Sequence, residues 1–380
     1  MMIKKMVCVI MSLVLLSLTG CWSYHGLNDM TIVTGVGIDI DPSTKEYLLT
    51  TEVVDATATT MESGTKAKLV ESRGKTVMDA VRNAKKRLLS KLYWGNNEIL
   101  VVGSDLAKNG NLGNVIDWFL SDEECRETVG IVVSQEKTAK DILKIEGLDS
   151  SVVAFEIKKI IEQDQTTVGT IENVPLFRVF SILESPGRSV VIPAFRNTKN
   201  DDKMVVEANG EAVFKGDKMI GYLDPEESKY YLFAVDGIHG GVINVSSKND
   251  NTPDVALEIS KNKTKSSYSY TGKNLKVILQ TDTDVYLDEI DAHVDLLDEN
   301  KIKEIETKAQ NMIEDHTKAV IKKVQTEYNS DIFGFGNMIY KKDPQLWKQL
   351  EPQWDKLFPS IQVEVQSKVN IVNTSFLKHS

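Results

Sequence analysis

The sequence predicts a multidomain protein of mixed α/β and α+β class, in which mixed sheets pack against helices. Strands alternate with helical stretches through the first half of the chain, which is typical of α/β architecture. The second half contains alternating strands and one long amphipathic segment, so we expect a C-terminal domain with antiparallel strands and one long helix. The 380 residues are 41% hydrophobic and 26% charged, a composition that supports a sizeable core.

Residues 1–20 have the pattern of a lipoprotein signal peptide. The basic pair Lys4-Lys5 precedes an uncharged apolar stretch, 6–18, that is too short for a membrane-spanning helix of about twenty residues. The following Leu18-Thr19-Gly20-Cys21 looks like a bacterial lipobox. The alternative interpretation is an ordinary signal peptide or a buried helix with a chance cysteine.

We therefore expect cleavage before Cys21 and covalent attachment of a diacylglycerol and an N-acyl chain to that residue. Two or three acyl chains give stable anchoring where one does not. Trp22 would then lie at the level of the lipid headgroups, where indole rings are favoured. No later stretch has 18 uncharged apolar residues, so we expect a soluble body tethered to a bilayer.

Residues 21–140 are predicted to form an N-terminal α/β domain, and 141–199 a mainly helical middle region that either stands alone or merges with that domain. The apolar patterns predict strands at 32–40, 47–53, 98–103 and 128–134, and helices at 75–92, 112–120 and 136–144. A loop is expected at 55–68. The polar stretch 197–203 is predicted to be a linker.

Residues 200–380 are predicted to form the C-terminal α+β domain. Its long amphipathic helix is expected at 299–328 and its last strand at 361–371. Asp343 and Pro344 are a favourable helix start, with an Asp cap and Pro at the first position. Trp347, Trp354 and Phe358 then recur at helical spacing; we interpret this stripe as core, with a protein-binding face as the alternative.

The charge distribution limits the class of partner. The net charge is −10, and removal of Lys4 and Lys5 with the signal peptide makes it −12, which argues against nucleic acid as a partner. The predicted helix 75–92 nevertheless has a basic face opposite its apolar stripe. Anionic lipid headgroups, an acidic partner or plain solvation each explain this face, and its candidate contact residues are Arg82, Lys85, Lys86 and Lys91.

The sequence has no pattern typical of catalysis or metal binding. The five histidines are not paired with other ligands at metal-binding spacing. Gly35–Asp39 lacks the third glycine of a nucleotide-binding loop, and His239-Gly240-Gly241 is not accompanied by a nucleophile elbow. We expect Cys125 to be a buried or half-buried spectator and the carboxylates between 288 and 298 to form a solvated face. The chain is therefore predicted not to be an enzyme and to bind no metal or cofactor.

Several stretches occur together in an order that resembles one family, the Ger(x)C spore-germination lipoproteins. The stretches are Cys21-Trp22 with Asn28-Asp29, Gly35–Asp39, Leu92–Asn96, Leu100–Gly103, Ala212–Lys218, and Asp331–Gly336 followed by Pro344, Trp347, Trp354 and Phe358. Ser23–Gly26 stand where family members often have acidic residues, which weakens only the N-terminal match.

This resemblance implies a non-enzymatic C subunit of a nutrient germinant receptor, anchored to the outer face of the spore inner membrane. Its partners would be the receptor's multi-spanning A subunit and its transporter-like B subunit, and its role receptor assembly and germination signalling. The alternative is a solute-binding lipoprotein that delivers a small ligand to a transporter. Such proteins usually have two similar α/β lobes, whereas the two halves of this chain differ.

Overall fold

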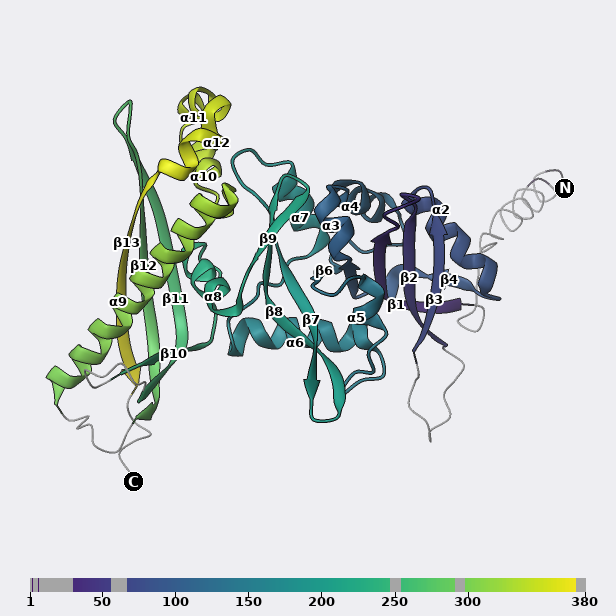
Figure 1. Cartoon of the computed structure of the whole chain (residues 1–380), viewed down its shortest axis with the longest axis horizontal. Coiled ribbons are helices and arrows are strands. Elements are labelled where there is room, and N and C mark those ends of the chain that lie inside the picture. Colours follow the sequence, from purple (N-terminus) through teal and green to yellow (C-terminus); the bar gives the residue numbers. More distant parts are fainter. Residues whose placement is uncertain are drawn as a thin grey trace.

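The computed structural model describes residues 30–55, 67–246, 254–290 and 298–373, together with Met2 and Met6. Two sheets lie along the length of the molecule, one in each half of the chain, and each is packed with helices (Figure 1). The predicted fold class is therefore confirmed.

The first sheet is mixed and has nine strands, with β1 near its middle. β1 pairs antiparallel with β2 and parallel with both β4 and β5, so one long strand organises three neighbours. The order is β3-β2-β1-β5-β6-β7-β8-β9. The strands are β1 (Met30–Ile40), β2 (Tyr47–Asp55), β3 (Lys68–Gly74), β4 (Lys91–Tyr93), β5 (Ile99–Val102), β6 (Gly130–Ser134), β7 (Val191–Asn200), β8 (Lys203–Lys215) and β9 (Lys218–Leu223).

Helices cover both faces of this sheet. One face packs against α2 (Val77–Ala84), α3 (Ser104–Asn109), α4 (Leu112–Ser121) and α7 (Leu176–Leu183). The other face packs against α5 (Ala139–Leu143) and α6 (Val153–Thr167). Two short 3₁₀ turns, η2 (Lys85–Arg87) and η3 (Trp94–Asn96), flank β4. In the middle region predicted to be mainly helical, 141–199, α6 and α7 are helical, whereas the residues from Val191 onward belong to β7.

The second sheet has four strands in the order β10 (Val242–Val245), β11 (Val255–Tyr270), β12 (Leu275–Ile290) and β13 (Gln362–Asn373). The first three are antiparallel as predicted, and β13 adds in parallel to β12. The predicted long helix is α9 (Glu299–Lys323), which crosses the sheet and contacts β13 (Figure 1). The remaining elements are α8 (Pro225–Ala234), η4 (Val324–Tyr328), α10 (Phe335–Lys342), α11 (Pro344–Leu350), η5 (Glu351–Gln353), α12 (Trp354–Leu357) and η6 (Phe358–Ser360).

The helix predicted at 75–92 is wrong in its second half. Leu88 has an extended backbone, and Leu92 lies on β4 opposite Thr31 of β1, where only 2% of it is exposed. The apolar spacing reflects burial in two separate places rather than on one helix. Residues 68–74 form β3, a strand that the sequence analysis did not predict. The strand was missed because its inward positions, Ser72 and Gly74, are not apolar.

The linker predicted at 197–203 is also wrong. Asn200 and Lys203 pair at the tip of the β7–β8 hairpin, and Asp201 adopts a positive φ of 55° in its turn. The first sheet therefore continues through β8 and β9, beyond the expected boundary at residue 200. How the chain divides into independently folding units stays a prediction.

The loop that precedes α10 joins the two halves of the molecule. The buried Asp331 carboxylate accepts backbone N–H bonds from Gly334, Phe335 and Gly336 at 2.9, 3.1 and 2.8 Å. These amides begin α10, so the carboxylate acts as its N-terminal cap. The Asp331 carbonyl accepts the amide of Ser189, just before β7, at 2.8 Å. One residue thus connects the second half of the chain to the first sheet.

Glycines make this joint close. The carbonyl of Gly187 accepts the amide of Asn337 at 2.8 Å, and Gly187 has a φ of +65°. If residue 336 had a side chain, its Cβ would lie only 2.8 Å from the Cα of Gly187, so Gly336 has no room for one. Ser330 extends the joint by donating its hydroxyl to the carbonyl of Phe214 on β8 at 2.6 Å.

We expect Gly187→Ala to destabilise the chain strongly. The new Cβ would lie 2.6 Å from the carbonyl carbon of Gly336, and the positive φ strains any L-residue. The two effects together should cost about 2–4 kcal/mol of the free energy of unfolding. Gly216→Ala is the matched control: its φ is +60°, but nothing lies within 4 Å of the added Cβ. Urea unfolding should show a loss of only about 1 kcal/mol there, and equal losses at both sites would contradict the proposed joint.

Candidate functional site

The structure describes four of the six predicted site residues; the lipidation site Cys21 and the contact residue Trp22 lie outside the described residues. Arg82 lies on α2, and Lys85 and Lys86 lie on η2, so the fold brings these three cations together.

Lys91 is separate from them. It lies on β4, and its ammonium group forms an ion pair with Glu124. Its inclusion in one basic helix face is therefore wrong, because the helix ends before it.

Local interactions determine how α2 presents its cations. The hydroxyl of Thr76 accepts the Asp79 amide at 3.1 Å and caps the helix start. The face that contains Val77, Ala80, Val81 and Ala84 is buried against the sheet. Arg82 consequently lies on the solvent side near the helix C-terminus, where a positive charge is favoured by the helix dipole.

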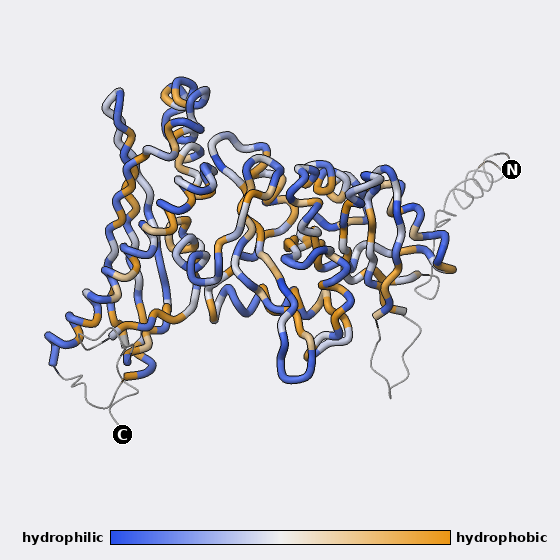
Figure 2. Tube along the Cα trace, viewed as in Figure 1, coloured by the Kyte–Doolittle hydropathy of each residue, from blue (hydrophilic) through white to orange (hydrophobic). Residues whose placement is uncertain are grey.

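Leu89 completes this surface and was missed by the sequence reasoning. Its exposed fraction is 108%, so the fold gives this leucine no apolar cover. We call Arg82, Lys85, Lys86 and Leu89 the basic tip. Within the described part of the chain, none of its three cations forms an ion pair. Figure 2 shows a short hydrophobic stretch bordered by hydrophilic residues at this end of the molecule.

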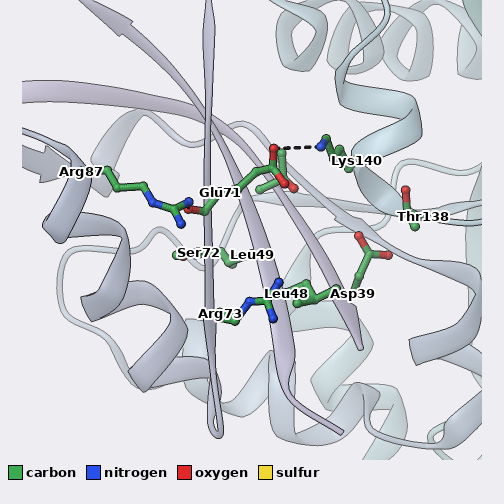
Figure 3. Close-up of a pocket in the computed structure, with 10 residues that line it drawn as sticks. Asp39, Leu48, Leu49, Glu71, Ser72, Arg73, Arg87, Thr138 and Lys140 are labelled. Carbon is green, nitrogen blue, oxygen red and sulfur yellow. Dashed lines mark hydrogen bonds and ion pairs between the residues drawn. The ribbon is translucent and has the colours of Figure 1, made fainter. Parts of the chain in front are cut away.

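A small polar pocket lies beside η2, whose Arg87 is part of its lining (Figure 3). Its volume is about 250 Å³, and it is lined by residues of β1, β2, β3, η2 and the start of α5. Two of its charged side chains are paired with each other: Lys140 contacts the Glu71 carboxylate at 2.8 Å. Arg87 donates to the Glu71 carbonyl oxygen.

Asp39 is the buried carboxylate of this pocket. It accepts the amide of Ala139 at 2.8 Å and so holds the start of α5. Burial raises its pKa to about 6, although hydrogen bonds from Ala139 and Lys140 oppose the shift. The backbone of Gly103 lies close to the Asp39 carboxylate: a Cβ added at Gly103 would be 1.8 Å from its oxygen.

Glu52 on β2 has the same structural role at α6. Its carboxylate accepts the amides of Val153 and Ala154 at 2.7 and 3.2 Å and the hydroxyl of Thr34 at 2.8 Å. Burial is the main cause of its raised pKa. Glu52 was missed by the sequence reasoning. The pattern that could have revealed it is an acidic residue at an inward position of the strand predicted at 47–53.

Glu211 on β8 is fully buried. One carboxylate oxygen accepts the Glu172 amide at 2.7 Å, and the other has no partner among the described residues. Burial raises the pKa of Glu211 well above its usual range, which favours the protonated form.

The other candidates have structural roles. Burial raises the pKa of the half-buried Cys125 thiol to about 12, as expected of an unreactive spectator. Gly241, with φ +111°, lies in a turn between α8 and β10. Among the described residues, no group of His, Cys, Asp or Glu could hold a metal ion. The acidic stretch 288–298 lies partly outside those residues.

Comparison with known proteins gives the family. The profile described as "Spore germination protein N-terminal domain" matches residues 23–197, and that described as "Spore germination B3/ GerAC like, C-terminal" matches residues 209–375. The chain belongs to the GerAC family of spore germination proteins. The resemblance noted in the sequence is thus confirmed.

Relatives of this GerAC-family chain match it from end to end. Spore germination protein KC of Bacillus subtilis (strain 168) is 24% identical, over 98% of this chain and 96% of its own length. Spore germination protein B3 of the same organism is 23% identical, over 96% of each chain. A solved structure, titled "Crystal Structure of the GerBC protein", superposes with a TM-score of 0.56 at 19% identity and covers 89% of this chain and 97% of its own. It shows that the fold is shared.

Asp39→Asn should change how the stability of this GerAC-family chain depends on pH. The folded pKa of about 6 exceeds the ordinary value of 3.8, so the folded state binds the proton more tightly. The tighter proton binding by Asp39 adds to the free energy of unfolding in full below about pH 4, and this addition is lost as the pH rises through about 6. Relative to the variant, the wild type should lose up to about 3 kcal/mol between about pH 4 and 7.

Asp41→Asn is the control of opposite sign. Hydrogen bonds from the Thr44 and Ser43 amides lower the pKa of exposed Asp41. Its contribution is therefore present above the unfolded pKa and lost as the pH falls. Urea unfolding between about pH 2 and 7 measures both contributions, and parallel curves for wild type and Asp39→Asn would contradict the account of Asp39.

Proposed function

We propose that the chain is the lipid-anchored C subunit of a spore nutrient germinant receptor, required for receptor assembly and germination signalling at the outer face of the spore inner membrane. The observation that carries this proposal is the match of both family profiles, which together extend over most of the chain. The names of its relatives give the role in spore germination.

The lipobox-like sequence supports the anchor. A thioether-linked diacylglycerol and an N-acyl chain at Cys21 would hold the mature chain to the bilayer. The strand β1 begins at Met30, nine positions after Cys21, so only a short stretch of chain connects the proposed anchor to the first sheet. Within the described residues, no helix combines the length and the apolar character needed to cross a membrane.

The proposed partners are the receptor's membrane-embedded A and B subunits. The acidic net charge of −10 disfavours nucleic acid. We propose no catalytic role and no cofactor beyond the covalent lipids. The buried carboxylates Asp39, Glu52 and Asp331 support this view, because each satisfies backbone amides at a helix start.

The solute-binding alternative fits the fold less well. Proteins of that class usually have two similar α/β lobes, whereas this chain combines a nine-stranded sheet with a four-stranded one. The pocket of about 250 Å³ is small for a ligand site, and two of its charged side chains, Lys140 and Glu71, are paired with each other.

Cys21→Ala is the variant that tests the anchor and the role together. In spores that lack the native chain, the variant should leave the membrane fraction, and nutrient-triggered dipicolinate release should fall to the level of the deletion strain. Cys125→Ala is the matched control, since its half-buried thiol has no proposed role. It should retain both membrane association and germination. Full germination with Cys21→Ala, or membrane association that does not depend on Cys21, would contradict the proposal.

A further inference from the structure

The register of β1 and β4 places the basic tip beside the point where the folded chain leads back to its N-terminus. Met30, the first residue of β1, is the partner of Lys91 on β4. Leu89 lies only two residues before Lys91. In Figure 1, α2 and β4 lie together at one end of the molecule, opposite the second sheet.

The tether limits how far this end can lie from a bilayer. About nine residues separate Cys21 from Met30, and a fully extended chain of that length spans at most about 30 Å. A tethered surface meets the bilayer at a high effective concentration, so weak individual contacts suffice for docking.

The charges of the basic tip are available for an external partner. Arg82, Lys85 and Lys86 are exposed and have no ion-pair partner in the described chain. The nearest acid on α2, Asp79, is engaged elsewhere: its carboxylate accepts the Lys75 amide at 3.1 Å and the Asn83 side chain at 3.2 Å. Each cation near an anionic membrane surface increases the membrane binding constant about fivefold.

Leu89 adds an apolar contact among these cations. A leucine without cover in the folded chain gains free energy when its side chain enters the boundary between headgroups and acyl chains. Cations around an apolar side chain are the combination that interfacial membrane-binding segments use. A purely acidic protein partner would account for the charges but not for Leu89.

We propose that the basic tip docks on anionic phospholipid headgroups with Leu89 inserted at the interface, and that this contact fixes the orientation of the anchored body on the bilayer. The inference rests on the proposed anchor at Cys21 and adds a second, non-covalent membrane contact. The long axis then points away from the bilayer, with the second sheet farthest from it.

Amide hydrogen exchange of the lipidated full chain in nanodiscs tests this inference. One set of discs contains phosphatidylcholine alone and the other adds phosphatidylglycerol. We expect exchange across 84–90 to be about fivefold slower or more in the anionic discs. Lys85→Glu with Lys86→Glu should abolish the slowing, and so should Leu89→Asp. Lys348→Glu with Lys356→Glu, the same change of charge at exposed sites on α11 and α12, should retain it.

The outcomes separate the two proposals. Equal exchange in both kinds of disc, from a chain that is anchored in each, overturns docking and leaves the receptor role intact. Slowing that appears only when membrane subunits are added also overturns docking, in favour of a protein partner for the basic tip. A chain that fails to enter either disc overturns the anchor and, with it, this inference.

Discussion

The two halves of the chain meet at Asp331, whose buried carboxylate fixes the loop that contacts the first sheet. Its oxygens hold the three amides that begin α10, and its carbonyl accepts the amide of Ser189 beside the first sheet. Burial raises the pKa of this carboxyl to about 6, against the effect of its hydrogen bonds. The stretch 331–336, which is part of the family resemblance, is therefore the joint between the two sheets. Glycine is required at position 336 of this stretch and at position 187 opposite it, because the backbones of Gly187 and Gly336 leave no room for a side chain between them.

The same use of buried acids recurs within the first sheet. Asp39 holds the start of α5, and Glu52 holds the start of α6. A buried carboxylate is costly, and backbone amides at a helix terminus compensate part of that cost. These groups pin helices to strands rather than face a substrate. A chain whose helices are held rigidly to its sheet suits a receptor subunit that makes stable contacts with its partners, as the proposed role requires. It suits a protein that closes around a ligand less well.

Sequence reasoning succeeded where a pattern has one structural explanation. The Asp343-Pro344 cap and the burial of Trp347 were predictable because helical spacing and capping are local. It failed where two structures share a pattern: apolar residues at 75–92 are buried on a helix and then on a strand, and the polar stretch 197–203 is a hairpin tip with the composition of a linker. The cations of the basic tip were predictable, whereas the exposure of Leu89 depends on tertiary structure and was not.

The central claim is that this chain works as one subunit of a membrane receptor. The most direct test is its purification, by a C-terminal affinity tag, from detergent-solubilised spore inner membranes, followed by mass spectrometry and sizing of the purified material. The account predicts that two multi-spanning membrane proteins co-purify with it in constant proportion. Recovery of the lipidated chain alone, at the size of a monomer and from membranes that contain those two proteins, would contradict the account.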